Sequence, residues 1–121
     1  MPVRAIRGAT QVAADEPDAI MEAVAELVRE MLTANDVADD HLISMVLTST
    51  PDLVSAYPAT GARLAGLVDV PLLSACEVDV PGSMPRVVRI MAHVQSPVTR
   101  AQIQHVYLRG TEGLRRAAEP Q

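Results

Sequence analysis

The pattern of hydrophobic and polar residues predicts one long helix among short strands. From Pro17 to Asn35 the apolar residues recur at every third or fourth position, the spacing of a helix with one buried face. Asp15 precedes this segment, and we expect its carboxylate to cap the first turn, with Pro17 where a missing N–H costs little. The apolar face comprises Ile20, Val24, Leu27, Val28, Met31 and Leu32, and the polar face carries Glu22, Glu26, Arg29 and Glu30.

The other segments predict five strands and a second, shorter helix. Leu42 to Ser49 is apolar enough for a strand buried on both faces, and Thr50-Pro51-Asp52 ends it. The predicted strands are Val3 to Val12, Leu42 to Ser49, Pro71 to Glu77, Arg86 to Gln95 and Gln104 to Arg109, and the short helix is Pro58 to Leu67. The order β-α-β-α-β-β-β indicates an α/β or α+β fold, a mixed β-sheet with one long and one short helix.

The chain length predicts the domain organisation. A chain of 121 residues suits a single domain that spans residues 1–121. After Gly110 the residues are small and charged, so we expect a mobile carboxyl-terminal tail over about 111–121.

The ten basic side chains are all arginine, and fifteen acidic residues leave a formal net charge of −5. Without lysine, Schiff-base catalysis and a P-loop NTPase are excluded, because both use a lysine amine. No basic stripe offsets the acidic total, so nucleic-acid binding is not expected. Every cation that the protein can offer a ligand is a planar guanidinium.

The single cysteine, Cys76, excludes an intrachain disulfide framework and fits a reducing compartment. In its apolar segment Cys76 reads as a small buried hydrophobe rather than a nucleophile. The three histidines, His41, His93 and His105, lie far apart in the sequence, so a metal site is not expected. No apolar run suits a signal core or a membrane span, and we expect a cytoplasmic protein without membrane contact.

Polar residues occupy strand positions where apolar residues are expected. Arg7 and Arg89 interrupt apolar stretches, Tyr107 follows a valine, and Glu77 closes the segment that begins at Pro71. Each could point to solvent from an open sheet, which alternation permits. Several together also suggest a polar pocket or a subunit interface, because a mid-sheet arginine is expensive to bury without a partner.

Four segments taken together resemble the AroH class of chorismate mutase. They are Ile6-Arg7-Gly8-Ala9-Thr10, Ser49-Thr50-Pro51-Asp52-Leu53, Glu77-Val78-Asp79-Val80 followed by Arg89, and Gln102-Ile103-Gln104-His105-Val106-Tyr107-Leu108. The resemblance runs from about Val3 to Leu114. Each segment alone is a weak signal, and their unbroken order makes the match strong.

The resemblance implies an enzyme that converts chorismate to prephenate, an intramolecular Claisen rearrangement on the route to phenylalanine and tyrosine. It also implies a homotrimer with the appearance of a pseudo-α/β-barrel, active sites at the subunit interfaces, and no metal or other cofactor. Chorismate is a dianion with two carboxylates, and bidentate guanidinium pairing suits such a ligand.

The same resemblance implies roles for individual residues. Arg89 would face the ether oxygen of the breaking C–O bond, and Glu77 would accept a hydrogen bond from the ring hydroxyl. Arg7 and Tyr107 would hold carboxylate oxygens. The other substrate-binding residues would be Tyr57 and Arg63 from the neighbouring subunit, Leu73 and Ser74, and Leu114 and Arg115, which would help cover the site.

Three residues depart from the family pattern. Ser74 replaces a cysteine and can still bind the ring hydroxyl through its own hydroxyl. Tyr57 replaces a phenylalanine, and Thr60 replaces a lysine near the mouth, which removes a cation that could steer the dianion. Strict alternation puts Ser74 and Glu77 on opposite faces, so we expect the chain to bend before Glu77.

Two other interpretations stay open at this point. A non-catalytic trimeric module that binds a small carboxylate and acts as a regulator would also use an arginine-lined pocket. A plain oligomerising domain would account for the apolar content of the chain, although not for the placement of the polar residues.

Overall fold

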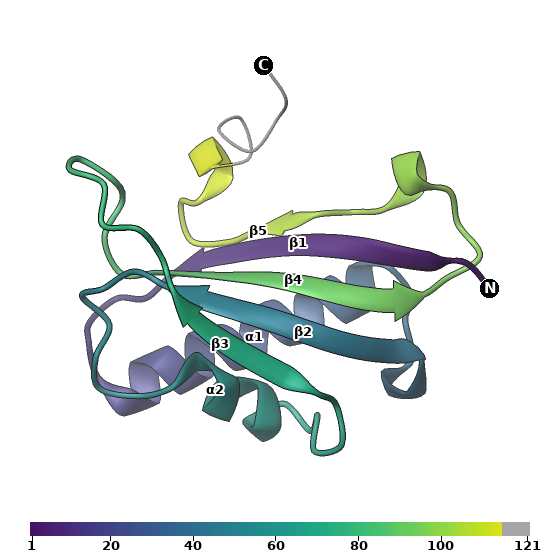
Figure 1. Cartoon of the computed structure of the whole chain (residues 1–121), viewed down its shortest axis with the longest axis horizontal. Coiled ribbons are helices and arrows are strands. Elements are labelled where there is room, and N and C mark those ends of the chain that lie inside the picture. The colour runs from purple at the N-terminus through teal and green to yellow at the C-terminus, as the bar shows by residue number, and fades with distance from the viewer. Residues whose placement is uncertain (115–121) are drawn as a thin grey trace.

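The computed structural model describes residues 1–114, and its elements follow the predicted order (Figure 1). The strands are β1 (Val3–Gln11), β2 (Leu42–Ser49), β3 (Leu72–Cys76), β4 (Val87–Gln95) and β5 (Val106–Tyr107). Helices α1 (Pro17–Ala34) and α2 (Pro58–Leu64) are accompanied by short 3-10 turns η1 (Asp39–His41) and η2 (Arg100–Gln102), and residues 112–114 are also helical. The predicted mixed α+β architecture, with one long and one short helix, is confirmed.

The five strands form one mixed sheet in the order β3-β2-β4-β1-β5. β4 runs antiparallel to both of its neighbours, β1 and β2, whereas β5 is parallel to β1 and β3 is parallel to β2. The sheet therefore has β3 at one edge and β5 at the other. A strand at an edge leaves backbone N–H and C=O groups without strand partners.

The last strand is much shorter than the predicted Gln104 to Arg109. The side-chain amide of Asn35 takes both backbone groups of Gln104, because its Oδ1 accepts from the Gln104 N–H at 2.7 Å and its Nδ2 donates to the Gln104 C=O at 2.8 Å. After β5 the chain turns at once, with positive φ angles at Arg109 and Gly110. Strand pairing is therefore confined to two residues.

Both helices pack on one face of the sheet and leave the other face uncovered (Figure 1). All the apolar positions predicted for the long helix are buried in α1. The two helices approach closely at Gly61, where an added Cβ would lie 2.6 Å from the Cβ of Val24. None of the helices in residues 1–114 is long and apolar enough to span a membrane.

β2 is buried on one face, not on both as predicted. Leu42, Met45 and Leu47 are buried against the helices, whereas Ile43 is exposed and Val46 and Thr48 are half-buried. The helices cover one side of the sheet, so the residues that point to the other side stay accessible in this single chain. The expectation of a buried Cys76 is wrong for a related reason, since β3 is an edge strand and Cys76 is exposed.

Asp15 does not cap α1, which begins after Glu16 without any side-chain cap. Its Oδ1 accepts hydrogen bonds from the Ser55 hydroxyl at 2.8 Å, the Val54 N–H at 3.0 Å and the Ser55 N–H at 3.1 Å. The hydrogen bond from the Ser55 side chain, together with the backbone ones, holds the pKa of Asp15 below its ordinary value of 3.8. The carboxylate therefore fixes the loop before α2 rather than the start of α1.

Candidate active site

The strand register aligns one residue from each strand in a row across the uncovered face. Tyr107 of β5 pairs with Ala9 of β1, Ala9 pairs with Arg89 of β4, Arg89 pairs with Thr48 of β2, and Thr48 pairs with Ala75 of β3. Residues that pair directly across strands point to the same face. Because strands lie about 4.8 Å apart, Tyr107 and Arg89 flank Ala9 at a distance of about 10 Å between their Cα atoms.

Arg89 and Glu77 meet at this row. Arg89 Nε lies 3.1 Å from Glu77 Oε2, and the two side chains are 42% and 22% exposed. The Nε–H is buried but not aligned for a hydrogen bond with that oxygen. Instead, the hydroxyl of Thr48 donates to Glu77 Oε2 at 2.8 Å. The guanidinium and the carboxylate predicted to handle the ether oxygen and the ring hydroxyl are thus adjacent in one chain.

The turn after β2 fixes the start of β4, close to Arg89. The Thr50 hydroxyl accepts the Val87 N–H at 3.0 Å and donates to Asp52 Oδ1 at 2.5 Å. The Asp52 carboxylate also accepts the Arg86 N–H, and Arg86 has a φ of +53°. The Thr-Pro-Asp segment therefore ties β2 to β4, and its polar side chains serve the backbone rather than a ligand.

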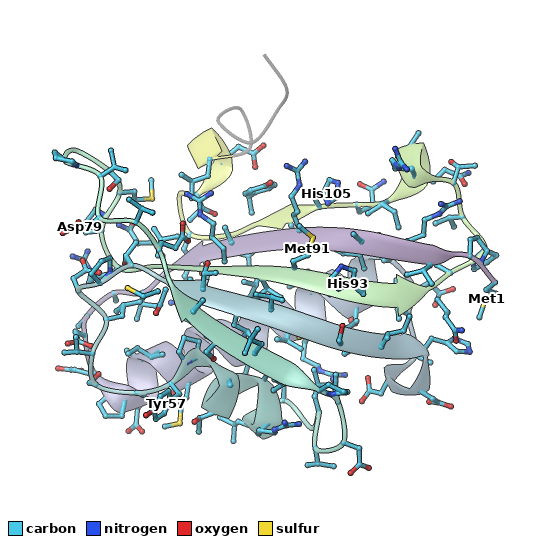
Figure 2. All side chains as sticks on the ribbon, in the orientation of Figure 1. Met1, Tyr57, Asp79, Met91, His93 and His105 are labelled. Atoms are coloured by element: carbon cyan, nitrogen blue, oxygen red, sulfur yellow. The ribbon has the colours of Figure 1, made fainter. Side chains whose placement is uncertain are left out.

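Arg7 lies on the same face, two residues before Ala9. Its backbone N–H donates to His105 Nδ1 at 2.9 Å, which joins β1 to the segment that leads into β5. This bond requires that Nδ1 carries no proton. Arg7, His93 and His105 line a depression beside Met91, and Figure 2 shows Met91 and His93 on the uncovered face.

A second group of predicted substrate-binding residues lies elsewhere, around α2 and β3. Tyr57 and Ser74 line a cavity of about 600 Å³ between β3 and the loop before α2. Tyr57 is 77% exposed and lies at the helix layer (Figure 2). Leu73 is 65% exposed, and the Arg63 guanidinium donates to the C=O groups of Leu67 at 2.6 Å and Val70 at 2.9 Å.

The structure does not bring Ser74 and Glu77 together, and the expected bend before Glu77 is absent. The Glu77 N–H donates to the Ser49 C=O at 2.9 Å, which continues the β2–β3 ladder by one residue. Ser74 pairs with the buried Leu47, so it points to the helix face, whereas Glu77 contacts Arg89 on the uncovered face. Regular alternation is kept.

The start of the carboxyl-terminal segment is held against the sheet. The Thr111 hydroxyl is buried and donates to the C=O groups of Ala9 at 3.1 Å and Leu108 at 2.8 Å. Leu114 is half-buried. Arg115, which the resemblance also implies would help cover the site, lies outside the described residues. The predicted mobility of the tail stays a prediction.

In the candidate site, two contacts were not predicted from the sequence: that of Thr48 with Glu77 and that of His105 with Arg7. Thr48 does carry a signal, because it is the first of three polar residues that follow the apolar stretch of β2. His105 lies one residue before β5, and nothing local indicates that it bonds to β1. Among residues 1–114, no three His, Cys, Asp or Glu side chains cluster as a metal site would require.

Comparisons with known proteins place almost the whole chain in one family. The family model of chorismate mutase type I matches residues 3–118. A chorismate mutase AroH from Thermus thermophilus is 47% identical over 114 residues, or 93% of each chain, and one from Bacillus subtilis is 37% identical over 109 residues, or 89% of this chain and 86% of that protein.

A solved structure of a chorismate mutase from Clostridium thermocellum superposes with a TM-score of 0.87 at 39% identity, covering 90% of this chain and 97% of that one. The matches span nearly the full length of this chain and of the proteins aligned with it, so they include both groups of polar residues described above. The chain belongs to the chorismate mutase type I family.

Proposed function

We propose that this chorismate mutase binds chorismate between its two groups of residues and rearranges it to prephenate without any covalent bond to the protein. In the reaction the ether C–O bond breaks while a C–C bond forms within the same molecule, so the atoms balance without a co-reactant. Membership of the family favours this enzyme over the non-catalytic carboxylate-binding module. The product serves phenylalanine and tyrosine synthesis.

The observation that carries the mechanism is the adjacent pair Arg89 and Glu77. Negative charge develops on the ether oxygen as the C–O bond breaks, and a guanidinium fixed beside that oxygen stabilises the transition state more than the ground state. Glu77 accepts the hydrogen bond of the ring hydroxyl. Arg7 and Tyr107, on the same face, bind carboxylate oxygens and hold the chair-like conformer that reacts.

The second group belongs, in this proposal, to a neighbouring subunit of a homotrimer with a pseudo-α/β-barrel appearance. Two features support an interface site: the edge strand β3 exposes Leu73, and one face of the sheet has no covering layer. Tyr57, Arg63 and Ser74 of one chain then complete the site of the next, and Leu114 helps to cover it. Leu73, which by register shares the uncovered face with Glu77, stays with the first group. The lone cysteine supports the proposed cytoplasmic location.

A direct assay tests the activity. Purified protein is mixed with chorismate, the loss of its ultraviolet absorbance is followed, and the product is identified as prephenate by mass spectrometry. Loss of chorismate with formation of another product indicates a lyase and refutes the proposal. Absence of turnover favours the carboxylate-binding module.

A mixing experiment tests the shared site. Arg89→Ala and Arg63→Ala chains, each inactive alone, are unfolded together and refolded so that mixed trimers form. In a cyclic trimer, each mixed assembly has one of its three interfaces with both arginines intact. Random mixing of equal amounts of the two chains is therefore expected to return about a quarter of wild-type activity. If no activity returns although light scattering shows mixed trimers, the two arginines do not meet at a subunit interface.

A further inference from the structure

The Thr48 hydroxyl is bonded to the carboxylate that the proposed mechanism places on the ring hydroxyl. Thr48 Oγ1 donates to Glu77 Oε2 at 2.8 Å, and the same oxygen lies 3.1 Å from Arg89 Nε. Thr48 sits between the two partners by register, since β2 lies between β3, which leads into Glu77, and β4, which carries Arg89.

The orientation of the Glu77 carboxylate depends on this hydroxyl. The Nε–H of Arg89 is buried and forms an ion pair with Glu77 Oε2 at 3.1 Å, but it is not aligned for a hydrogen bond. Within residues 1–114, the Thr48 hydroxyl is the one group that donates a hydrogen bond of good geometry to the Glu77 carboxylate. The backbone of Glu77 is fixed separately, by its N–H bond to the C=O of Ser49.

We propose that Thr48 is a positioning residue, which holds Glu77 by Oε2 and so presents Oε1 to the substrate hydroxyl and keeps the outer nitrogens of Arg89 available. This inference rests on the proposed roles of Glu77 and Arg89. Thr48 itself does not need to touch the substrate. Its effect is carried by the direction in which the neighbouring carboxylate points.

Loss of the hydroxyl has a defined consequence. A guanidinium and a carboxylate prefer a two-point, fork-to-fork pair. Without the Thr48 bond, Glu77 is free to rotate into such a pair with Arg89. The Glu77 carboxylate then neutralises the positive charge that Arg89 would direct at the ether oxygen. The transition state loses more stabilisation than the bound substrate does, because the negative charge on that oxygen develops only in the transition state.

Three variants separate positioning from packing. Thr48→Val keeps the shape and removes the hydroxyl, and Thr48→Ser keeps the hydroxyl and removes the methyl group. Ser44→Ala is the matched control, because Ser44 lies on the same strand and face and its hydroxyl is 3.5 Å from His93 Nδ1. Thr48→Ala replaces Thr48→Val if the latter does not fold.

Thr48→Val is expected to lower kcat by about tenfold or more, because a hydrogen bond to a charged group contributes energy of that size. KM should rise by less than about threefold. Thr48→Ser and Ser44→Ala should keep kcat within about twofold of wild type. Thr48→Val, Thr48→Ser, Ser44→Ala and the wild type should unfold at similar temperatures. The inference is overturned if Thr48→Val keeps wild-type kcat, or if Thr48→Ser loses as much as Thr48→Val.

Glu77→Gln distinguishes failure of this inference from failure of the mechanism. If Glu77→Gln is impaired and Thr48→Val is not, Glu77 acts without help from Thr48 and the inference alone is wrong. If Glu77→Gln has wild-type kinetics, the proposed role of Glu77 fails, and the positioning role falls with it.

Discussion

Replacement of Arg89 by alanine tests the mechanism most directly. The variant removes the guanidinium from the centre of the row on the uncovered face and leaves Glu77 bonded to Thr48. Removal of one group that stabilises developing charge typically lowers kcat by about a hundredfold to a thousandfold. Because the charge develops only as the C–O bond breaks, the loss should appear in kcat more than in KM.

The structure also sets the expected change in stability, which is small. The Arg89 side chain is 42% exposed and its contact with Glu77 lacks hydrogen-bond alignment, so solvent screens the pair. Such pairs contribute less than about 1 kcal/mol to the free energy of unfolding. Arg29→Ala is the matched control, because Arg29 is 44% exposed and pairs with Asp39 at 3.2 Å on the outer surface.

The assay compares steady-state kinetics and thermal unfolding of the two variants with wild type. Arg29→Ala should keep full turnover, and both variants should unfold within a few degrees of wild type, as about 1 kcal/mol corresponds to about 4 °C for a domain of this size. Arg89→Lys should also be severely impaired, because one ammonium cannot replace the guanidinium fork. Near-wild-type kcat in Arg89→Ala would refute the role of Arg89 in charge stabilisation.

Three further predictions concern stability, pH and substrate capture. Gly61→Ala places a Cβ 2.6 Å from the Val24 Cβ, so it should destabilise the fold by about 2 kcal/mol and lower Tm by about 8 °C in a thermal melt. Hydrogen bonds from the Ser55 hydroxyl and nearby backbone lower the pKa of Asp15, so its carboxylate stabilises the protein above pH about 4 and loses that effect as pH falls through the lowered pKa. Asp15→Asn should therefore melt below wild type at pH 7, with the difference closing below pH about 4; an equal difference at every pH contradicts this. Thr60→Lys should raise kcat/KM by about threefold at low salt and not at high salt, and no change at low salt contradicts steering of the dianion.

The elements that depend on local pattern were predicted well. The apolar spacing of α1 is a property of neighbouring residues, and all of its predicted apolar positions are buried. Two failures share another cause, which is a partner far away in the sequence. Asn35 shortens β5 through Gln104, 69 residues along the chain, and Asp15 binds Ser55, 40 residues along. Side-chain partners at such distances leave no periodic signal.

The sequence indicates which residues to consider for the candidate site, but not the geometry that joins them. Arg89 and Glu77 could be nominated because both are charged and lie in or next to apolar strands, and the resemblance named their roles. The contribution of Thr48 depends on the order β3-β2-β4, which places β2 between the two charged partners. Strand order follows from how the whole sheet packs, so no stretch of sequence encodes the Thr48–Glu77 bond by itself.

The alternation of β3 has a consequence for how many chains one site needs. Ser74 faces the helix layer with Tyr57, whereas Glu77, three residues later, faces the opposite side with Arg89. Three is an odd number, and successive side chains of a strand point to opposite faces, so a regular strand cannot turn both groups toward one ligand. The ladder continues through Glu77 without a bend. In the proposed trimer, a single substrate that touches both a Ser74 and a Glu77 takes them from two chains, so the proposed mechanism itself calls for assembly.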